Sequence, residues 1–276
     1  MIARLAVGSS ELAVDLARPV DLAVPLDFDG AQPRHFGAEP ASARPFVAGA
    51  FSGDVGRGAS CNCGTITLTP HCNGTHTESV GHLTREPFDA RRAIPLGLIP
   101  ALLLSVAPEE AGHANEAATP PPVAGDRLIT HRALRTARDR VQARLPPAFA
   151  PRALVVRTLP NDPSKRTRDY AGNPPPYLTL DAARGLVAGG IEHLVLDVPS
   201  VDRTYDEGHL SGHRAFFGLP ARSTRLADAT RAHCTITELA YVPDDAADGA
   251  WLLAIHAPAL GGDAVPSRPL LYRLLA

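Results

Sequence analysis

The sequence has no surplus of positive charge and almost no lysine. Its 27 lysine and arginine residues face 29 acidic ones, which gives a formal net charge of -2, and Lys165 is the only lysine. A protein that binds nucleic acid uses surplus cations to release counterions from the phosphates. The charge balance therefore argues against a nucleic-acid partner.

Long apolar runs are also missing. The longest, residues 98–107, contains Pro100 and Ser105 and is far shorter than the roughly 20 apolar residues that a membrane-spanning helix needs. Residues 1–10 lack the positive run and apolar stretch of a secretory leader. We therefore expect no membrane partner.

The four cysteines do not form a disulfide framework. Cys61 and Cys63 are too close in sequence for an easy mutual bridge, so a cytoplasmic location fits best. With Cys72 they would suggest a structural zinc site, but the spacing differs from the usual Cys-x₂-Cys and no second pair follows. The chain also lacks a Gly-x-Ser-x-Gly elbow, a phosphate loop and a dinucleotide fingerprint.

The chain is divided into short elements by its 27 prolines and 23 glycines. Apolar and β-branched runs predict strands, and apolar residues at helical spacing predict helices. The expected strands are residues 12–16, 65–69, 98–106, 153–157, 193–198, 235–242 and 251–257, and the expected helices are residues 128–145 and 179–188.

The order of these elements predicts an α/β fold. A strand, loop, helix and strand over residues 153–198 indicate parallel strands joined by a right-handed crossover. We expect residues 35–51 to be irregular, residues 108–125 to be an inserted loop, and residues 244–249 to turn a hairpin or a sheet edge. Without a repeat or a clear linker, residues 1–276 are expected to form a single domain with a mixed β-core flanked by helices.

A histidine cluster follows the expected strand at residues 65–69. His76 and Glu78 are two residues apart, so on an extended segment they face the same side. Imidazole and carboxylate are the groups that Zn²⁺ or Mn²⁺ takes from a protein, and imidazole also moves protons near neutral pH. His82 is close enough to line the same pocket. The alternative is a set of surface histidines on a polar loop.

Two neighbouring residues, His71 and Cys72, are candidates for the first metal ligand of the cluster. The Asn73-Gly74 turn would fold either His71 or Cys72 back towards His76. Imidazole and thiolate both bind zinc. We take His71 as the first choice and Cys72 as the second.

A metal site needs further ligands from downstream. Residues 207–214 offer His209 and His213, and Glu238 lies within an apolar strand. A carboxylate is rarely buried there without a partner, although a solvated strand face would also accommodate it.

These residues also carry a family resemblance. The chain resembles the cyclase family of metal-dependent hydrolases, which includes bacterial kynurenine formamidases (arylformamidases) and isatin hydrolases. The family motif His-x-Gly-Thr-His-x-Asp-x-Pro-x-His is matched in register over residues 74–82. Further segments match in the same order, namely residues 14–19, 154–158, 196–202, 237–239 and 266–269.

The resemblance implies a role for each matched residue. It implies that His76 binds a metal, that Glu78 bridges to a second metal held by His213 and Glu238, and that His82 is the acid/base. His209 is the second choice for the later histidine.

The chain departs from the motif at two ligand positions. Cys72 stands where the family has its first histidine, with His71 adjacent. Glu78 replaces the aspartate and extends the carboxylate by about 1.5 Å, one more carbon–carbon bond. The two departures would either compensate each other, so that both metals are still bound, or leave a site that binds one metal or none.

The resemblance therefore implies an enzyme. We expect a hydrolase of a carbon–nitrogen bond in a small amide, formamide or lactam, with one or two Zn or Mn ions per chain. A homodimer or homotetramer is expected.

Two arginines and two aromatic residues are candidates for substrate binding. Arg268 or Arg157 would orient an acidic substrate, or form a structural ion pair. Phe36 and Tyr205 would line the substrate pocket, or pack in the core. The alternative function is a non-catalytic protein of the same fold that binds a metal or a small acid.

Overall fold

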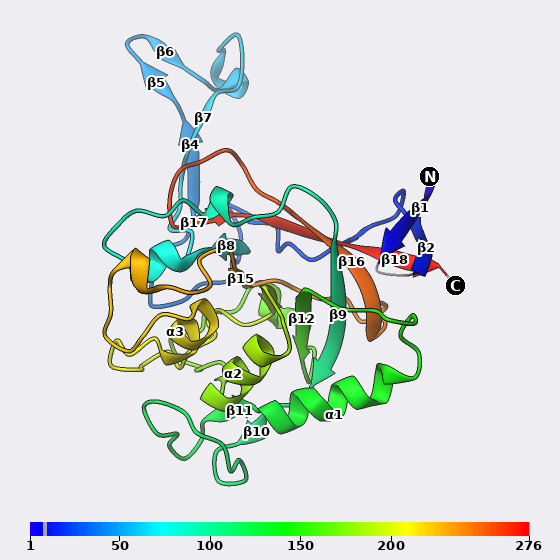
Figure 1. Ribbon diagram of the computed structural model, residues 1–276. Helices are drawn as coiled ribbons and strands as arrows, with labels where there is room; N and C mark the ends of the chain where they lie inside the picture. Colours follow the sequence, from blue (N-terminus) through cyan, green and yellow to red (C-terminus); the bar gives the residue numbers. More distant parts are fainter. Residues whose placement is uncertain (8–9, 276) are drawn as a thin grey trace.

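A mixed β-sheet runs through the computed structural model, which describes residues 1–7 and 10–275 (Figure 1). Within these residues the strand order is β1-β2-β18-β16-β9-β12-β14-β15-β8-β17, with β3 beside β18. The strands are β1 (Ile2–Val7), β2 (Ser10–Asp15), β3 (Val20–Asp21), β8 (His76–Glu78), β9 (Ile99–Val106), β12 (Ala153–Thr158), β14 (His193–Leu196), β15 (Thr235–Glu238), β16 (Gly249–His256), β17 (Ala264–Pro266) and β18 (Arg268–Leu275).

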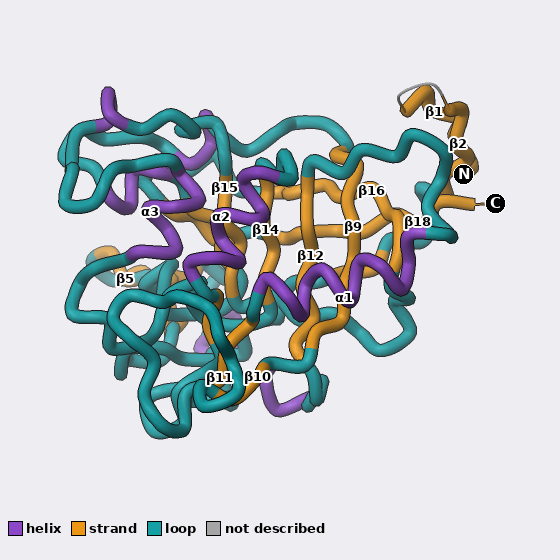
Figure 2. Tube along the Cα trace, turned by 60° about the horizontal axis from the view of Figure 1, so that its bottom comes forward, coloured by secondary structure: helices purple, strands orange, loops and turns teal. Residues whose placement is uncertain are grey.

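The centre of the sheet is the expected parallel unit. β9, β12, β14 and β15 are parallel neighbours, and both faces of β12 and β14 are buried, as their continuous apolar runs require. The helices α1 (His131–Gln142), α2 (Leu180–Ala188) and α3 (Ser211–Phe217) connect these strands in turn and lie on one side of the sheet (Figure 2). The α/β fold with a mixed core is thus confirmed.

Two hydrophobic clusters fill the two faces of the sheet. Leu104 and Leu196 contribute to the cluster that also contains Phe216 of α3. Val155 and Val195 contribute to the second cluster, on the other face. None of the helices in residues 1–7 and 10–275 is long and apolar enough to cross a membrane.

The helix starts follow from side-chain caps. The Thr179 hydroxyl accepts a hydrogen bond from the Ala182 N–H, so α2 begins where the sequence predicted. Thr130 caps α1 in the same way, so this helix starts later than the predicted residue 128. The residues before it form β11 (Arg127–Ile129), which pairs with β10 (Glu109–Glu110) and β13 (Tyr177–Leu178). The loop expected at residues 108–125 lies mostly between β10 and β11.

An arm projects from the body over residues 42–67 (Figure 1, top). β4 (Ser42–Pro45) pairs with β7 (Gly64–Thr67), and β5 (Val47–Ala48) pairs with β6 (Phe51–Ser52). The irregular segment expected at 35–51 therefore contains short strands. The strand expected at 65–69 exists, but it belongs to this arm and not to the central sheet.

The expected hairpin around residues 244–249 is wrong. β16 pairs with β9 and β18, whereas β15 pairs with β14 and β8, so the two strands are separated in the sheet and neither is an edge. β15 ends at Glu238 because Leu239 adopts a left-handed conformation with φ 54°. Short 3₁₀ turns complete the fold, namely η1 (Val55–Arg57), η2 (Val80–Leu83), η3 (Ala90–Arg92), η4 (Pro163–Arg166) and η5 (Leu226–Asp228).

A buried ion pair links the ends of β12 and β14. The Lys165 ammonium donates to Asp197 Oδ2 at 2.8 Å and to the Thr158 hydroxyl at 2.9 Å. Asp197 also accepts hydrogen bonds from the Thr158 N–H and hydroxyl. This network fixes the start of the segment 197–202, which leads into the candidate site.

Candidate metal centre

His76 and Glu78 lie on the short strand β8, between β15 and β17. Glu238 of β15 is directly opposite His76 in the antiparallel register, so their side chains share one face. Thr77 points to the other face, where its hydroxyl bonds with the Thr237 hydroxyl at 2.7 Å. The strand geometry therefore brings His76, Glu78 and Glu238 together on one buried face.

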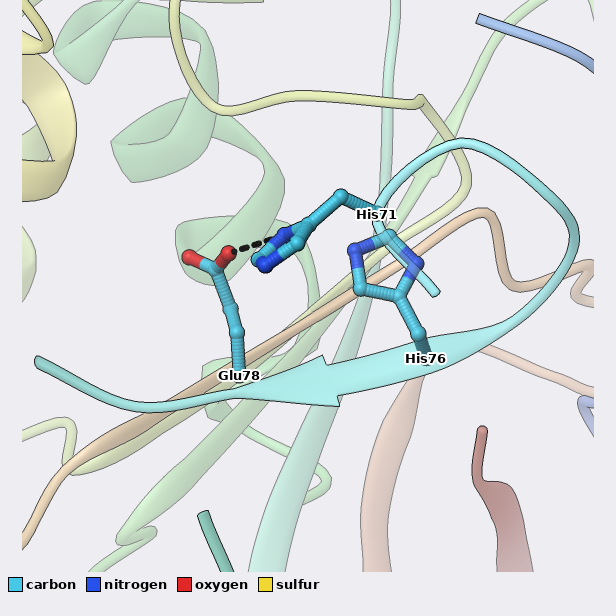
Figure 3. Close-up of side chains that lie close together, drawn as sticks. All are labelled: His71, His76 and Glu78. Carbon is cyan, nitrogen blue, oxygen red and sulfur yellow. Dashed lines mark ion pairs between the residues drawn. The ribbon is translucent and has the colours of Figure 1, made fainter. Parts of the chain in front are cut away.

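Glu78 lies at the centre of the cluster. Its Oε2 is 3.1 Å from His71 Nδ1, and its Oε1 is 2.9 Å from His213 Nε2 (Figure 3 shows the contact with His71). Glu238 Oε2 is 3.5 Å from His76 Nε2, and Glu238 Oε1 is 3.7 Å from His213 Nε2. The Glu78 side chain is long enough to reach His71 on one side and His213 on the other. The five first-choice ligand candidates therefore lie in one cluster, namely His71, His76, Glu78, His213 and Glu238.

Buried polar atoms in this cluster lack hydrogen bonds. Both Glu78 oxygens, His76 Nε2 and His213 Nε2 are buried without a hydrogen-bond partner, although ring nitrogens of His71 and His213 lie 3.1 and 2.9 Å from Glu78. A buried carboxylate that lacks partners is costly. Carboxylate and imidazole are ligands for divalent metals, so this donor set fits a metal ion.

The Asn73-Gly74 turn lies between His71 and His76, and the structure brings His71, but not Cys72, into the cluster. The Asn73 side chain accepts from the Thr69 N–H at 2.7 Å. Gly74 has φ 76°, and a Cβ at this position would be 2.8 Å from Leu26, so the turn requires glycine. His71 belongs to a group of potential ligands with His76, whereas Cys72 belongs to no such group among the described residues.

Two aspartates of the site, Asp202 and Asp263, were not predicted from the sequence. Asp202 Oδ2 is 2.6 Å from His213 Nδ1, and the same carboxylate accepts from the Gly212 and His213 N–H groups at the start of α3. Asp263, just before β17, bonds with His71 Nε2 at 2.9 Å and with His82 Nδ1 at 3.4 Å. Asp202 falls in a matched segment of the sequence, but no local pattern could have indicated Asp263.

The surroundings favour positive charge at the centre. Burial alone would lower the pKa of His71, but the hydrogen bond with Asp263 and the nearby Glu78 raise it to about 10. Burial also opposes charge on His213, yet Glu78 and Asp202 raise its pKa well above the usual value. The pKa of Glu78 is lowered, against burial, by His213 and His82. The carboxylates that raise these histidine pKa values, namely Glu78, Asp202 and Asp263, would also attract a divalent cation.

His209 and Phe36 lie apart from this cluster. His209 is 45% exposed and 3.9 Å from Glu207, and it belongs to no potential metal group in the described chain. Phe36 is exposed, and its ring packs against His35 with 3.9 Å between centroids. Tyr205 is also exposed, so neither aromatic residue packs in the core.

The two arginine candidates form ion pairs. Arg268 is exposed and bonds with Asp21 at 2.8 Å. Arg157 is buried and bonds with the Ser105 hydroxyl, the Pro243 carbonyl and Asp248. The geometry supports the alternative interpretation of both, as structural ion pairs.

The fold is similar to several solved structures. A protein described as a predicted metal-dependent hydrolase from Bacillus stearothermophilus is 18% identical with a TM-score of 0.56, covering 92% of this chain and 98% of its own. Isatin hydrolase A from Labrenzia aggregata is 17% identical with a TM-score of 0.59, covering 92% and 93%. Isatin hydrolase A from Ralstonia solanacearum is 16% identical with a TM-score of 0.58, covering 92% and 91%.

The sequence itself matches a known family. No curated protein matches the chain. Residues 14–203, which include β8 and the segment up to Asp202, match the family described as "Putative cyclase". This match spans more than half of the 276 residues, and the fold agrees with it, so the chain belongs to the cyclase family.

Proposed function

We propose that this chain is a metal-dependent hydrolase that cleaves a carbon–nitrogen bond of an amide, formamide or lactam. The observation that carries the proposal is Glu78, which is fully buried between His71 and His213 with neither oxygen hydrogen-bonded. Family membership supports a hydrolase of this kind, because several structures of the same fold are described as metal-dependent hydrolases or isatin hydrolases.

The proposed ligand sets share Glu78. His71, His76 and Glu78 would hold one Zn or Mn ion, and Glu78, His213 and Glu238 would hold a second. A bound metal of this kind lowers the pKa of water and polarises a carbonyl group. The residues of the chain fix the ligand directions, and the burial of Glu78 and His76 excludes bulk water from the rear of the centre.

His82 is the proposed acid and base. Its ring is 28% exposed and lies 4.1 Å from the His71 ring and 5.4 Å from the His213 ring, measured between centroids. It therefore lies beside the proposed ligands and is partly open to solvent. His82 takes a proton from the attacking water and gives it to the leaving nitrogen.

The substrate class follows from family membership and the polar centre. A solved structure of similar fold is an isatin hydrolase bound to the product analogue thioisatinate, which makes a lactam the first substrate to test. A formamide is the second, because kynurenine formamidases belong to the family that the motif resembles.

The test combines metal analysis with a substrate panel. We expect near-stoichiometric Zn or Mn in purified protein, lost in the His76→Ala/Glu78→Ala double variant, and hydrolysis of at least one lactam or N-formyl substrate. Ester substrates complete the panel as a test for hydrolysis of another bond. Replacement of the exposed His113 by alanine is the matched control. Bound metal without turnover of any substrate would indicate the non-catalytic alternative, and full turnover in His82→Ala would refute the assigned acid/base.

Location and assembly are further proposals. The exposed Cys61 and Cys63 are free thiols, which fits a reducing cytoplasm. A homodimer or homotetramer is expected, and light scattering coupled to size-exclusion chromatography measures its mass.

A further inference from the structure

We propose that Asp263 is a positioning residue that orients both the ligand His71 and the proton carrier His82. One oxygen of its carboxylate, Oδ2, is 2.9 Å from His71 Nε2 and 3.4 Å from His82 Nδ1. This inference rests on the proposed function, because it requires His71 to be a ligand and His82 to be the proton carrier. Asp263 itself belongs to neither the motif nor the proposed ligand sets.

The carboxylate determines which ring nitrogens carry hydrogen. An ionised carboxylate only accepts hydrogen bonds, so His71 Nε2 and His82 Nδ1 both carry a proton. In a neutral imidazole the other nitrogen then has the free lone pair. For His71 this is Nδ1, which points towards Glu78 at 3.1 Å (Figure 3). For His82 it is Nε2.

Each free nitrogen is the one that the proposed chemistry needs. A metal binds the lone pair of a neutral imidazole, and a carboxylate on the second nitrogen fixes the ring and its tautomer. A general base needs the same arrangement, because its reactive nitrogen must accept a proton. Asp202 holds Nδ1 of His213 in the same way, but it serves one ring, whereas Asp263 serves two.

The backbone holds Asp263 in position. Its carbonyl accepts from the Ser79 N–H at 2.9 Å, and the Ser79 carbonyl accepts from the His82 N–H at 3.1 Å. Gly81 permits this close approach, because a Cβ at that position would be 3.1 Å from Asp263 Cβ and 2.3 Å from the Phe88 carbonyl oxygen. Asp263 and His82 are therefore fixed to the same short segment.

Zinc binding and histidine tautomers test this role. We compare unmodified protein with Asp263→Ala, Asp263→Asn and Asp263→Glu by Zn²⁺ competition titration and by nitrogen-15 spectra of the imidazole rings. Asp54→Asn is the matched control, since Asp54 also forms a part-exposed ion pair, with Arg57 at 3.2 Å. The Asp263 side chain is 43% exposed, so the variants are expected to fold, and thermal melting checks this.

We expect Asp263→Ala and Asp263→Asn to weaken Zn²⁺ binding by about 10- to 100-fold and to change the tautomers of His71 and His82. At saturating Zn²⁺, kcat falls with little change in KM and its pH profile shifts, while Asp263→Glu restores part of the loss. Unchanged zinc affinity and tautomers in Asp263→Ala would overturn the inference but leave the proposed function standing. Loss of one whole zinc equivalent would make Asp263 a ligand and overturn it as well. Unmodified protein that binds neither Zn²⁺ nor Mn²⁺ would overturn both.

Discussion

His193 allows a test of the fold that does not involve the metal centre. This residue begins β14, its side chain is 2% exposed, and its Nδ1 bonds with the Thr235 hydroxyl at 2.9 Å. Burial lowers its pKa from the usual 6.5 to about 4, although Glu192 acts in the opposite direction. The folded chain therefore keeps His193 neutral at a pH where the unfolded chain protonates it.

The sign and size of the effect follow from this pKa difference. Between about pH 4 and pH 6.5 His193 binds up to one more proton in the unfolded chain than in the folded chain, so lowering the pH through this range favours unfolding. The contribution of His193 is fully present above pH 6.5. At pH 5 the loss is about 2 kcal/mol, and at pH 4 it is about 3 kcal/mol.

The assay is urea unfolding of unmodified protein and His193→Gln at pH 7.5, 6 and 5. Glutamine keeps a polar group near Thr235 but cannot be protonated. We expect the free energy of unfolding of the variant to fall by about 2 kcal/mol less between pH 7.5 and pH 5. His113→Gln, at an exposed site, should leave the pH dependence unchanged. Equal pH dependence in His193→Gln and unmodified protein would refute the reasoning.

Four further predictions concern the site and its support. His71→Ala should weaken Zn²⁺ binding in a competition titration far more than Cys72→Ser, and the reverse order would assign the thiol as ligand. Gly81→Ala should lower the free energy of unfolding by about 1–3 kcal/mol, because its methyl group meets the Phe88 carbonyl at 2.3 Å; a melting curve unchanged from that of Gly97→Ala, where a Cβ meets nothing within 4 Å, would contradict this. Thr179→Ala should cost about 1 kcal/mol in urea unfolding through loss of the α2 cap, with Thr179→Ser as the neutral control. Chelation should abolish hydrolysis and added Zn²⁺ or Mn²⁺ should restore it; turnover that survives exhaustive chelation argues against the proposed metal.

The sequence was most informative where the evidence lies within a few residues. Apolar runs identified the parallel strands, and the helix expected at residues 179–188 corresponds to α2, because both patterns depend on neighbouring residues. Pairing partners depend on distant segments. The strand at 65–69 was recognised, but its pairing with β4 in the arm was not, and the separation of β15 from β16 was missed for the same reason.

The same difference between neighbouring and distant residues applies to the candidate site. The spacing of His76 and Glu78 predicted a shared face because a strand alternates its side chains. The resemblance already favoured His213 over His209, but the contact of His213 with Glu78 depends on α3, whose first turn Asp202 holds. Asp263 is 192 residues from His71, and only the pairing of β17 with β8 brings the two together.

The Lys165–Asp197 pair has a practical consequence for labelling this protein. Lys165 is the only lysine, and its side chain is 7% exposed and bonded to Asp197 and Thr158. Amine-reactive reagents should therefore leave the Lys165 side chain of the folded protein unmodified. Modification of Lys165 requires the segment around it to open. The rate of that modification, followed by mass spectrometry, would report local opening at the ends of β12 and β14 without an engineered probe.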